Sequence, residues 1–247
     1  MFPIRDHNPS RRTPLVTWAL IAANILVFLS YWPLFSDERA LAAFFNDWAL
    51  VPAALFYGEG ETYRIFTSMF MHGGLMHLAG NMLFLWIFGD NLEDVLGHVG
   101  FLLFYLASGV AAALSQALID PTSTIPMVGA SGAIAGVMGG YLLLFPRARV
   151  DVLIIFVVFV QVIPLPAWMM LGFWFGMQVL SGTLAPPDMG GVAYWAHAGG
   201  FIAGAVLVLP AWLRRGARHY WVQTHGHPPH PATHAPTTVP IVRRRRR

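Results

Sequence analysis

The chain has 247 residues, of which 56% are hydrophobic and only 11% are charged, whereas an ordinary soluble domain has about 45–50% and about 25%. So few charges cannot cover the surface of a water-soluble globule, and the composition predicts a membrane protein. The formal net charge of +3 comes entirely from arginine, which in a membrane protein indicates topology or anionic lipid rather than nucleic acid, and the absence of cysteine excludes disulfides, thiolate metal sites and cysteine nucleophiles.

Six apolar segments predict membrane-spanning helices, because a crossing needs about 20 mostly apolar residues. None of the six contains Asp, Glu, Arg or Lys. They are Leu15–Tyr31, Met71–Gly89, Gly100–Ile119, Val128–Phe145, Pro166–Leu184 and Val192–Leu213. The first lacks a small-residue cleavage site, so we expect a retained span rather than a removable signal peptide. The predicted fold is an all-α membrane protein, with one six-span domain over residues 15–215.

Arginine placement predicts the orientation, since short cytoplasmic loops collect positive charge. With residues 1–14 as a cytoplasmic tail, thirteen of the fifteen arginines lie on the cytoplasmic side. Only Arg39 and Arg64 lie outside. We therefore expect a multi-pass protein with both termini in the cytoplasm, compatible with a bacterial inner membrane.

The outer loop Ser36–Phe70 is the longest connection between predicted spans. It carries Trp48, Phe56, Tyr57 and Tyr63 among acidic residues. Amphipathic rings are favoured at the membrane–water interface, so we expect this loop to lie partly in that layer.

The segment Val150–Ile163 is almost wholly apolar but only about 14 residues long, and it ends before Pro164. A segment of this length is more typical of an interfacial or re-entrant stretch than of a crossing. A seventh span would also place the C-terminal arginines outside, so we predict that this segment does not cross.

The C-terminal residues 216–247 are rich in histidine, proline and arginine. This composition predicts a disordered cytoplasmic tail with affinity for anionic lipid. Imidazoles are good metal ligands, but prolines separate His225, His227, His230 and His234 and leave them no fixed geometry. We therefore predict no metal site.

Polar side chains inside a membrane are costly and point to function. His77 and Asn81 share one face of the second span at i, i+4, and His72 lies just before them. Ser131 is near the start of the fourth span and His197 near the start of the sixth. All three spans enter from outside, so these groups are expected to converge in the outer leaflet.

Glycine spacing predicts which helices touch. Gly132, Gly136 and Gly140 recur every four residues in the fourth span, and Gly200 and Gly204 do so in the sixth. Small residues at this spacing let helix backbones approach closely in membranes. If these two faces pack together, Ser131 and His197 come within hydrogen-bonding range.

A serine hydroxyl becomes a nucleophile when a neutral imidazole removes its proton. No carboxylate occurs in the predicted spans, so the pattern indicates a Ser131–His197 dyad rather than a triad. Asn81, His77 and the backbone N–H of Ser131 are the candidate oxyanion donors. The alternative for His77 and Asn81 is an interhelical hydrogen-bond clasp without catalytic function.

Taken in order, these motifs resemble the rhomboid family of intramembrane serine proteases over roughly residues 12–215. The matching residues are Gly129-Ala130-Ser131-Gly132, Ala196-His197-Ala198-Gly199-Gly200, His72, His77, Asn81 and the pair Tyr63-Arg64. The resemblance implies a serine endopeptidase that needs no metal, cofactor or ATP and cuts membrane-protein substrates near the outer face. It implies Ser131 as nucleophile, His197 as general base and acid, and an oxyanion hole of His77, Asn81 and the Ser131 N–H. His72, Arg64, Gly129 and Gly132 would support the site.

Two positions depart from the family pattern. Tyr63 stands where the family usually has tryptophan before arginine, and Ala135 stands where several relatives place an aromatic residue against the histidine. The group that orients His197 is therefore not identified by the sequence. Two other functions are alternatives to a protease: a transporter or channel, disfavoured because the polar cluster stops in the outer half, and a catalytically silent rhomboid-like protein that binds membrane clients.

Overall fold

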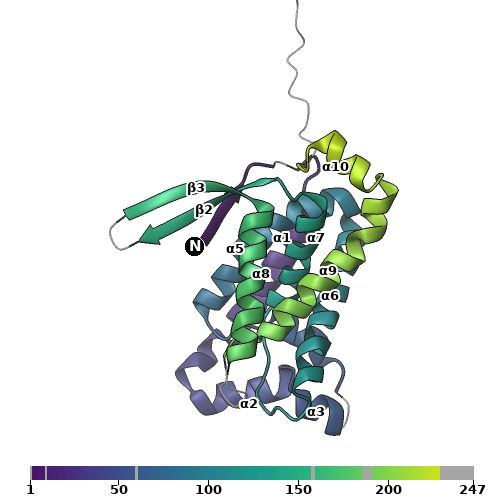
Figure 1. The fold of residues 1–247 in the computed structure, drawn as a ribbon. Coiled ribbons are helices and arrows are strands. Elements are labelled where there is room, and N and C mark those ends of the chain that lie inside the picture. The colour runs from purple at the N-terminus through teal and green to yellow at the C-terminus, as the bar shows by residue number, and fades with distance from the viewer. Residues whose placement is uncertain (1, 9, 59–60, 157–158, 186–190, 229–247) are drawn as a thin grey trace, which may run out of the picture.

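The computed structural model describes residues 2–8, 10–58, 61–156, 159–185 and 191–228. The described part is mostly helical, and its long helices run roughly parallel in a bundle (Figure 1). These helices are α1 (Leu15–Tyr31), α5 (Leu75–Leu96), α6 (His98–Ile119), α7 (Ser131–Leu144), α8 (Ala167–Leu184) and α9 (Tyr194–Arg214).

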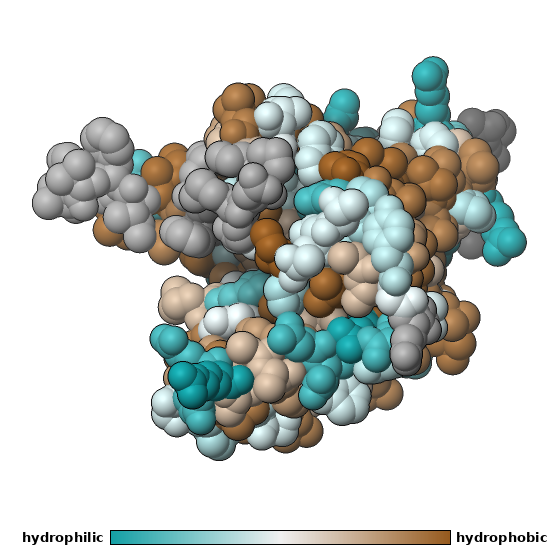
Figure 2. All heavy atoms as spheres, turned by 90° about the horizontal axis from the view of Figure 1, so that it is seen from below, coloured by the Kyte–Doolittle hydropathy of each residue, from teal (hydrophilic) through white to brown (hydrophobic). Residues whose placement is uncertain are grey.

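A helix occupies each of the six segments predicted to be apolar spans. The bounds of α1 match the prediction, whereas α5 starts later than predicted and continues through Glu93 to Leu96. Three helical stretches of the described residues are long and apolar enough to cross a membrane: Leu15–Ser36, His98–Ile119 and Tyr194–Arg214. Viewed from the end that carries α2 and α3, hydrophobic side chains reach the outline of the molecule on several sides (Figure 2), as expected for helices that face lipid.

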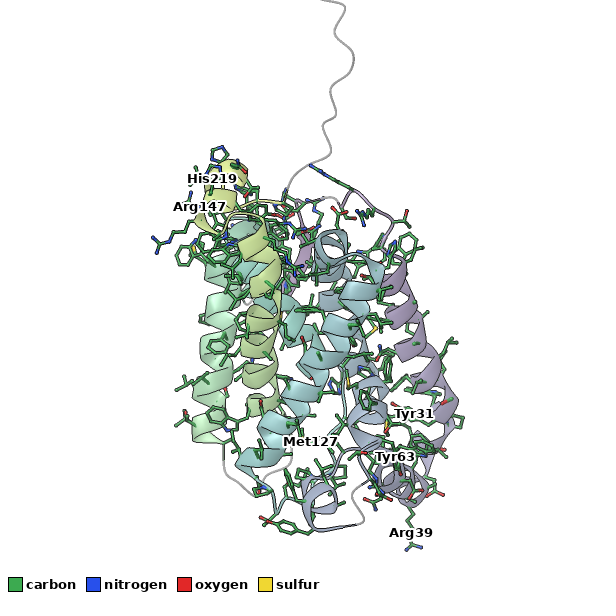
Figure 3. The ribbon with its side chains drawn as sticks, turned by 90° about the vertical axis from the view of Figure 1, so that its right-hand side faces the viewer. Tyr31, Arg39, Tyr63, Met127, Arg147 and His219 are labelled. Atoms are coloured by element: carbon green, nitrogen blue, oxygen red, sulfur yellow. The ribbon has the colours of Figure 1, made fainter. Side chains whose placement is uncertain are left out.

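The long connection between α1 and α5 is folded into short helices at one end of the bundle (Figure 1). They are η1 (Trp32–Ser36), α2 (Glu38–Trp48), α3 (Pro52–Tyr57), α4 (Arg64–Thr67) and η2 (Ser68–Phe70). The Asp37 carboxylate accepts hydrogen bonds from the backbone N–H groups of Arg39 and Ala40, which caps the start of α2. Figure 3 shows Arg39 and Arg147 at opposite ends of the bundle.

The segment predicted to be an interfacial or re-entrant stretch that does not cross forms a β-hairpin. Strands β2 (Arg149–Phe156) and β3 (Phe159–Pro166) pair antiparallel, and the N-terminal strand β1 (Phe2–Asp6) adds to the other edge of β2. The all-α prediction is therefore wrong in this region, and Phe2–Asp6 of the predicted N-terminal tail form a strand of the sheet. The physical reason is that a short run of β-branched residues favours a strand once a partner strand is available.

Side chains on both faces of β2 are packed or paired where the strand adjoins the helix bundle. Val150 and Val152 are fully buried in the main hydrophobic core. Asp151 points to the opposite face, where its carboxylate accepts hydrogen bonds from the Arg5 guanidinium at 2.7 Å and contacts His7 Nε2 at 2.6 Å. The sheet is thus fixed by core packing on one side and by charge on the other.

The C-terminal region also departs from the expected disorder. Residues Arg218–Thr224 form α10, with Tyr220 buried and the Trp221 indole donating a hydrogen bond to the Leu143 carbonyl at 2.9 Å. Two of the histidines considered as metal ligands, His230 and His234, lie outside the described residues, as do the terminal arginines. The described residues contain no group of three or more side chains placed to hold a metal ion.

Close backbone contact between α7 and α9 is confirmed at the predicted glycines. A Cβ built on Gly200 would lie 2.1 Å from the Gly132 carbonyl oxygen, and one built on Gly204 would lie 2.0 Å from that of Gly136. No side chain fits at those distances, so glycine alone allows the approach. This contact sets the separation between the N-terminal ends of the two helices, which carry Ser131 and His197.

Candidate active site

Backbone hydrogen bonds hold the residues between α6 and α7 that lead to Ser131. Met127 and Leu50 exchange two backbone hydrogen bonds, and the Gly129 N–H donates to the Ser68 carbonyl at 2.9 Å. Gly129 has a φ of +131°, a conformation that residues with a Cβ rarely adopt. Helix α7 then begins at Ser131, so the N–H groups of its first turn have no acceptor within the helix.

Ser131 and His197 form the central contact of the site. The Ser131 Oγ lies 2.8 Å from His197 Nε2, and the two residues come from the first turns of α7 and α9. This is a hydrogen-bonding distance between a hydroxyl and an imidazole nitrogen. An unprotonated Nε2 in this place is positioned to accept the serine proton.

The other side of the His197 ring contacts α8. Gln178 Oε1 lies 2.8 Å from His197 Nδ1, and the Trp174 ring lies 5.8 Å from the imidazole, centroid to centroid. With Gln178 Oε1 as acceptor, Nδ1 carries the proton and Nε2 is free to act as a base toward Ser131. Trp174 supplies the aromatic neighbour that the small, buried Ala135 does not provide.

His77 lies beside the segment that precedes Ser131. Its Nδ1 accepts a hydrogen bond from the Gly73 N–H at 3.3 Å, which leaves the proton of the neutral ring on Nε2. A Cβ built on Gly129 would lie 2.9 Å from that Nε2 and 3.4 Å from the Ser131 Oγ. His77 Nε2 and the Ser131 hydroxyl therefore both lie next to Gly129, and both residues line the same cavity.

Asn81 lies one helical turn beyond His77 on α5 and is 8% exposed. Its Nδ2 is buried and has no hydrogen-bond partner among the residues that the structure describes. Asn81 lines a cavity of about 610 Å³ together with His77, Ser131, Trp174 and His197. A buried amide donor beside a cavity and without an acceptor is suited to a ligand oxygen.

His72 and Arg64 do not line this cavity. The His72 ring is fully buried and packs edge-on against His77 at 5.1 Å between centroids, while its backbone N–H and C=O both bond to the Tyr31 hydroxyl. Arg64 donates to the Asn46 carbonyl and pairs with Glu61, and the Tyr63 hydroxyl donates to the Asp47 carbonyl at 3.0 Å. His72 thus contacts a site residue, whereas Arg64 and Tyr63 tie α4 to the end of α2.

The structure brings together Ser131, His197, His77 and Asn81, with Gly129 and Gly132 directly beside them. Sequence reasoning missed Gln178 and Trp174, which contact the histidine. It also missed Gln116, whose Oε1 accepts hydrogen bonds from the Trp195 and Ala196 N–H groups at the start of α9. The available signal was the rarity of amide side chains in apolar segments, because Gln116 and Gln178 each lie in a predicted span.

Comparisons with known proteins point to one family. The Rhomboid domain family profile matches residues 59–214. The chain is 32% identical to the rhomboid protease GluP of Bacillus subtilis over 80% of its own length and 36% of that protein. It is 33% identical to the mitochondrial rhomboid protein 1 of Saccharomyces cerevisiae over 77% of its own length and 51% of that protein. The chain therefore spans about a third to a half of the length of these relatives.

Proposed function

The chain belongs to the rhomboid family, and from this membership we propose that it is an intramembrane serine endopeptidase that cleaves membrane-protein substrates. The observation that carries the proposal is the 2.8 Å contact between the Ser131 Oγ and His197 Nε2 at the wall of a large cavity. The family accounts for the protease and membrane assignments, and the contact supplies the specific residues of a Ser–His dyad.

In the acylation step, His197 Nε2 accepts the hydroxyl proton as the Ser131 oxygen bonds to the carbonyl carbon of the scissile peptide. The negative charge that develops on the carbonyl oxygen is stabilised by three donors, the Asn81 amide, the His77 Nε2–H and the Ser131 backbone N–H. The protonated His197 then gives its proton to the leaving amine, and the acyl group remains on Ser131.

Deacylation repeats these steps with water as the nucleophile. His197 Nε2 removes a proton from the water, which attacks the acyl carbon, and the proton then passes to the Ser131 oxygen as the ester bond breaks. Throughout both steps the Nδ1–H of His197 donates a hydrogen bond to Gln178 Oε1, and this bond keeps the ring in its orientation. The cavity of about 610 Å³ has room for water beside Ser131.

The proposal includes six spans, formed by α1, α5, α6, α7, α8 and α9. Arginine counts favour a cytoplasmic location for both termini, which places the α2–α3 end and the mouth of the site outside. Substrates would then be cut near their outer ends, where small or helix-weakening residues expose the backbone. The bacterial inner membrane stays a prediction, since the relatives come from bacterial and mitochondrial sources.

The proposal is tested with the full chain in lipid vesicles, by covalent labelling of the protein and by its cleavage of a substrate. We expect a fluorophosphonate probe to add to Ser131, as located by peptide mass spectrometry, and a fluorescent transmembrane substrate to be cut. Ser131→Ala and His197→Ala should abolish both signals, while Ser115→Ala, a hydroxyl loss on α6 outside the cavity lining, should retain them.

Cleavage that survives in Ser131→Ala would refute the dyad. Substrate association without any cleavage or probe adduct in the unchanged chain would favour instead the catalytically silent client-binding protein. Equal folding of the variants, measured by thermal unfolding in detergent, is required for either conclusion.

A further inference from the structure

The outer part of strand β3 exposes apolar side chains on both faces of the sheet. Val160 is 63% exposed and Val162 is 49% exposed, and Ile163 on the opposite face is 36% exposed. Residues 152–166 contain no Asp, Glu, Lys or Arg. Edge strands that face water usually carry charges that prevent aggregation, so this strand is unlike a water-facing edge.

The hairpin occupies a particular place relative to the bundle. It extends sideways from the end opposite α2 and α3, beyond the outline of the helices (Figure 1). Its base at Arg149 follows Arg147, which lies at that same end (Figure 3). In the six-span arrangement, a hairpin that extends sideways here passes over the membrane surface next to the protein.

Exposed tryptophans near the sheet indicate where the membrane–water interface lies. Ile4 of β1, Trp18 of α1 and Trp86 of α5 line one cavity of about 460 Å³, and the two tryptophans are 45% and 59% exposed. Trp168, in the first turn of α8 directly after β3, is 56% exposed. Tryptophan is enriched where the hydrocarbon of a bilayer meets its headgroups. The tryptophans of these three helices therefore indicate that this layer lies beside the sheet.

The charges at the base of the hairpin and the unpaired backbone groups of β3 limit how deep the hairpin can lie in the bilayer. Arg147 and Arg149 lie just before and at the start of β2, at the base of the hairpin, and the nearby Asp151 carboxylate is paired with Arg5 and His7. In the described residues β3 pairs only with β2, so its outer backbone groups have no strand partner. Unpaired backbone groups are excluded from the hydrocarbon core but not from the hydrated headgroup layer.

We propose that the β2–β3 hairpin lies in the headgroup layer on the arginine-bearing side of the bilayer, with Val160 and Val162 against the outer ends of the lipid chains. The occupant of its apolar surface is therefore lipid. This inference rests on the membrane-spanning arrangement proposed above, but it does not depend on protease activity.

The absence of cysteine allows a direct test by site-specific spin labelling. Val162→Cys is labelled with a nitroxide in the full chain, which is reconstituted in vesicles of phosphatidylethanolamine and phosphatidylglycerol. Collision rates are measured with oxygen, which concentrates in lipid chains, and with a water-soluble nickel chelate. We expect oxygen to relax this label at least several-fold more effectively, relative to nickel, than a label at Gln223→Cys on α10.

A label at Leu26→Cys, on the lipid-facing surface of α1 and 66% exposed, is the control for the spanning arrangement. If Leu26 is oxygen-accessible while Val162 is as nickel-accessible as Gln223, the hairpin stands in water and the proposal is overturned. If Val162 is shielded from both reagents, a protein surface covers it, which also overturns the proposal. Nickel access at Leu26 would refute the spanning arrangement itself.

Discussion

Gln178 Oε1 lies 2.8 Å from Nδ1 of His197, on the opposite side of the ring from Ser131. The contact joins α8 to α9 and fixes which nitrogen of the imidazole carries its proton. In the proposed dyad, the neutral Gln178 amide would orient the histidine as a carboxylate does in a Ser-His-Asp triad, without placing a charge among apolar helices.

Gln178→Leu is expected to lower kcat by about fivefold with little change in KM, because one hydrogen bond of about 1 kcal/mol orients the base. Steady-state cleavage by the reconstituted enzyme measures this. Ser181→Ala, on the same helix but outside the cavity lining, is the matched control. A Gln178→Leu enzyme with unchanged kcat would show that Trp174 packing alone orients the ring.

Asn81→Ala is expected to lower kcat by about 10²-fold, the typical loss for one oxyanion donor. The midpoint of thermal unfolding should change little, because the Asn81 Nδ2 has no hydrogen-bond partner to lose among the described residues. Parallel kinetics and melting curves decide the role. A large fall in the melting midpoint would instead identify Asn81 as an interhelical clasp.

Gly204→Ala is expected to destabilise the bundle by about 1–3 kcal/mol, because the new Cβ would meet the Gly136 carbonyl oxygen at 2.0 Å. Gly176→Ala on α8 is the control, since nothing lies within 4 Å of its Cβ position. That substitution should be neutral or slightly stabilising. Equal unfolding midpoints for the two variants would contradict the close packing of α7 and α9.

Gly129→Ala is expected to reduce activity by more than tenfold while the protein remains folded. The residue has a φ of +131°, and a Cβ would lie 2.9 Å from two atoms of the His77 ring. The clash therefore displaces His77 from its place beside Ser131. Fluorophosphonate labelling rates together with circular dichroism would check it, and full activity would show that His77 is not a donor.

The Asp151 contacts predict acid sensitivity of the sheet. Hydrogen bonds from His7 and from Arg5 hold the pKa of the Asp151 carboxyl below its ordinary value of 3.8. Because the folded-state pKa is the lower one, this stabilisation is complete above about pH 4 and is lost as the pH falls through the folded-state value.

Hydrogen exchange of the β1 and β2 amides, measured from pH 6 to pH 3 and corrected for intrinsic rates, would show this loss. The Asp151→Asn variant should exchange faster than the unchanged chain at pH 6. The difference between the two proteins should become smaller as the pH falls below about 4, toward the folded-state pKa of Asp151. A difference that stays constant across this range would refute the role of the carboxylate charge.

Several features of this protein were determined by the sequence alone. A run of about 20 uncharged apolar residues is typical of a membrane-spanning helix, and helices occur at all six predicted segments, with α1 from Leu15 to Tyr31. The glycine spacing in two of those segments predicted the contact of α7 with α9, because only small residues permit it. The family was likewise identified from the order of its motifs and is confirmed by the profile match.

The tertiary structure decided what depends on distant partners. Residues 150–163 have a pattern that fits several local structures, and they form a hairpin whose other partner is the N-terminal strand Phe2–Asp6. Gln178 and Trp174 are the neighbours of His197, and they lie on a different helix and belong to no sequence motif. Periodicity fixes the face of a helix on which a side chain lies, but only the packing of α8 against α9 determines that the Gln178 amide meets the imidazole.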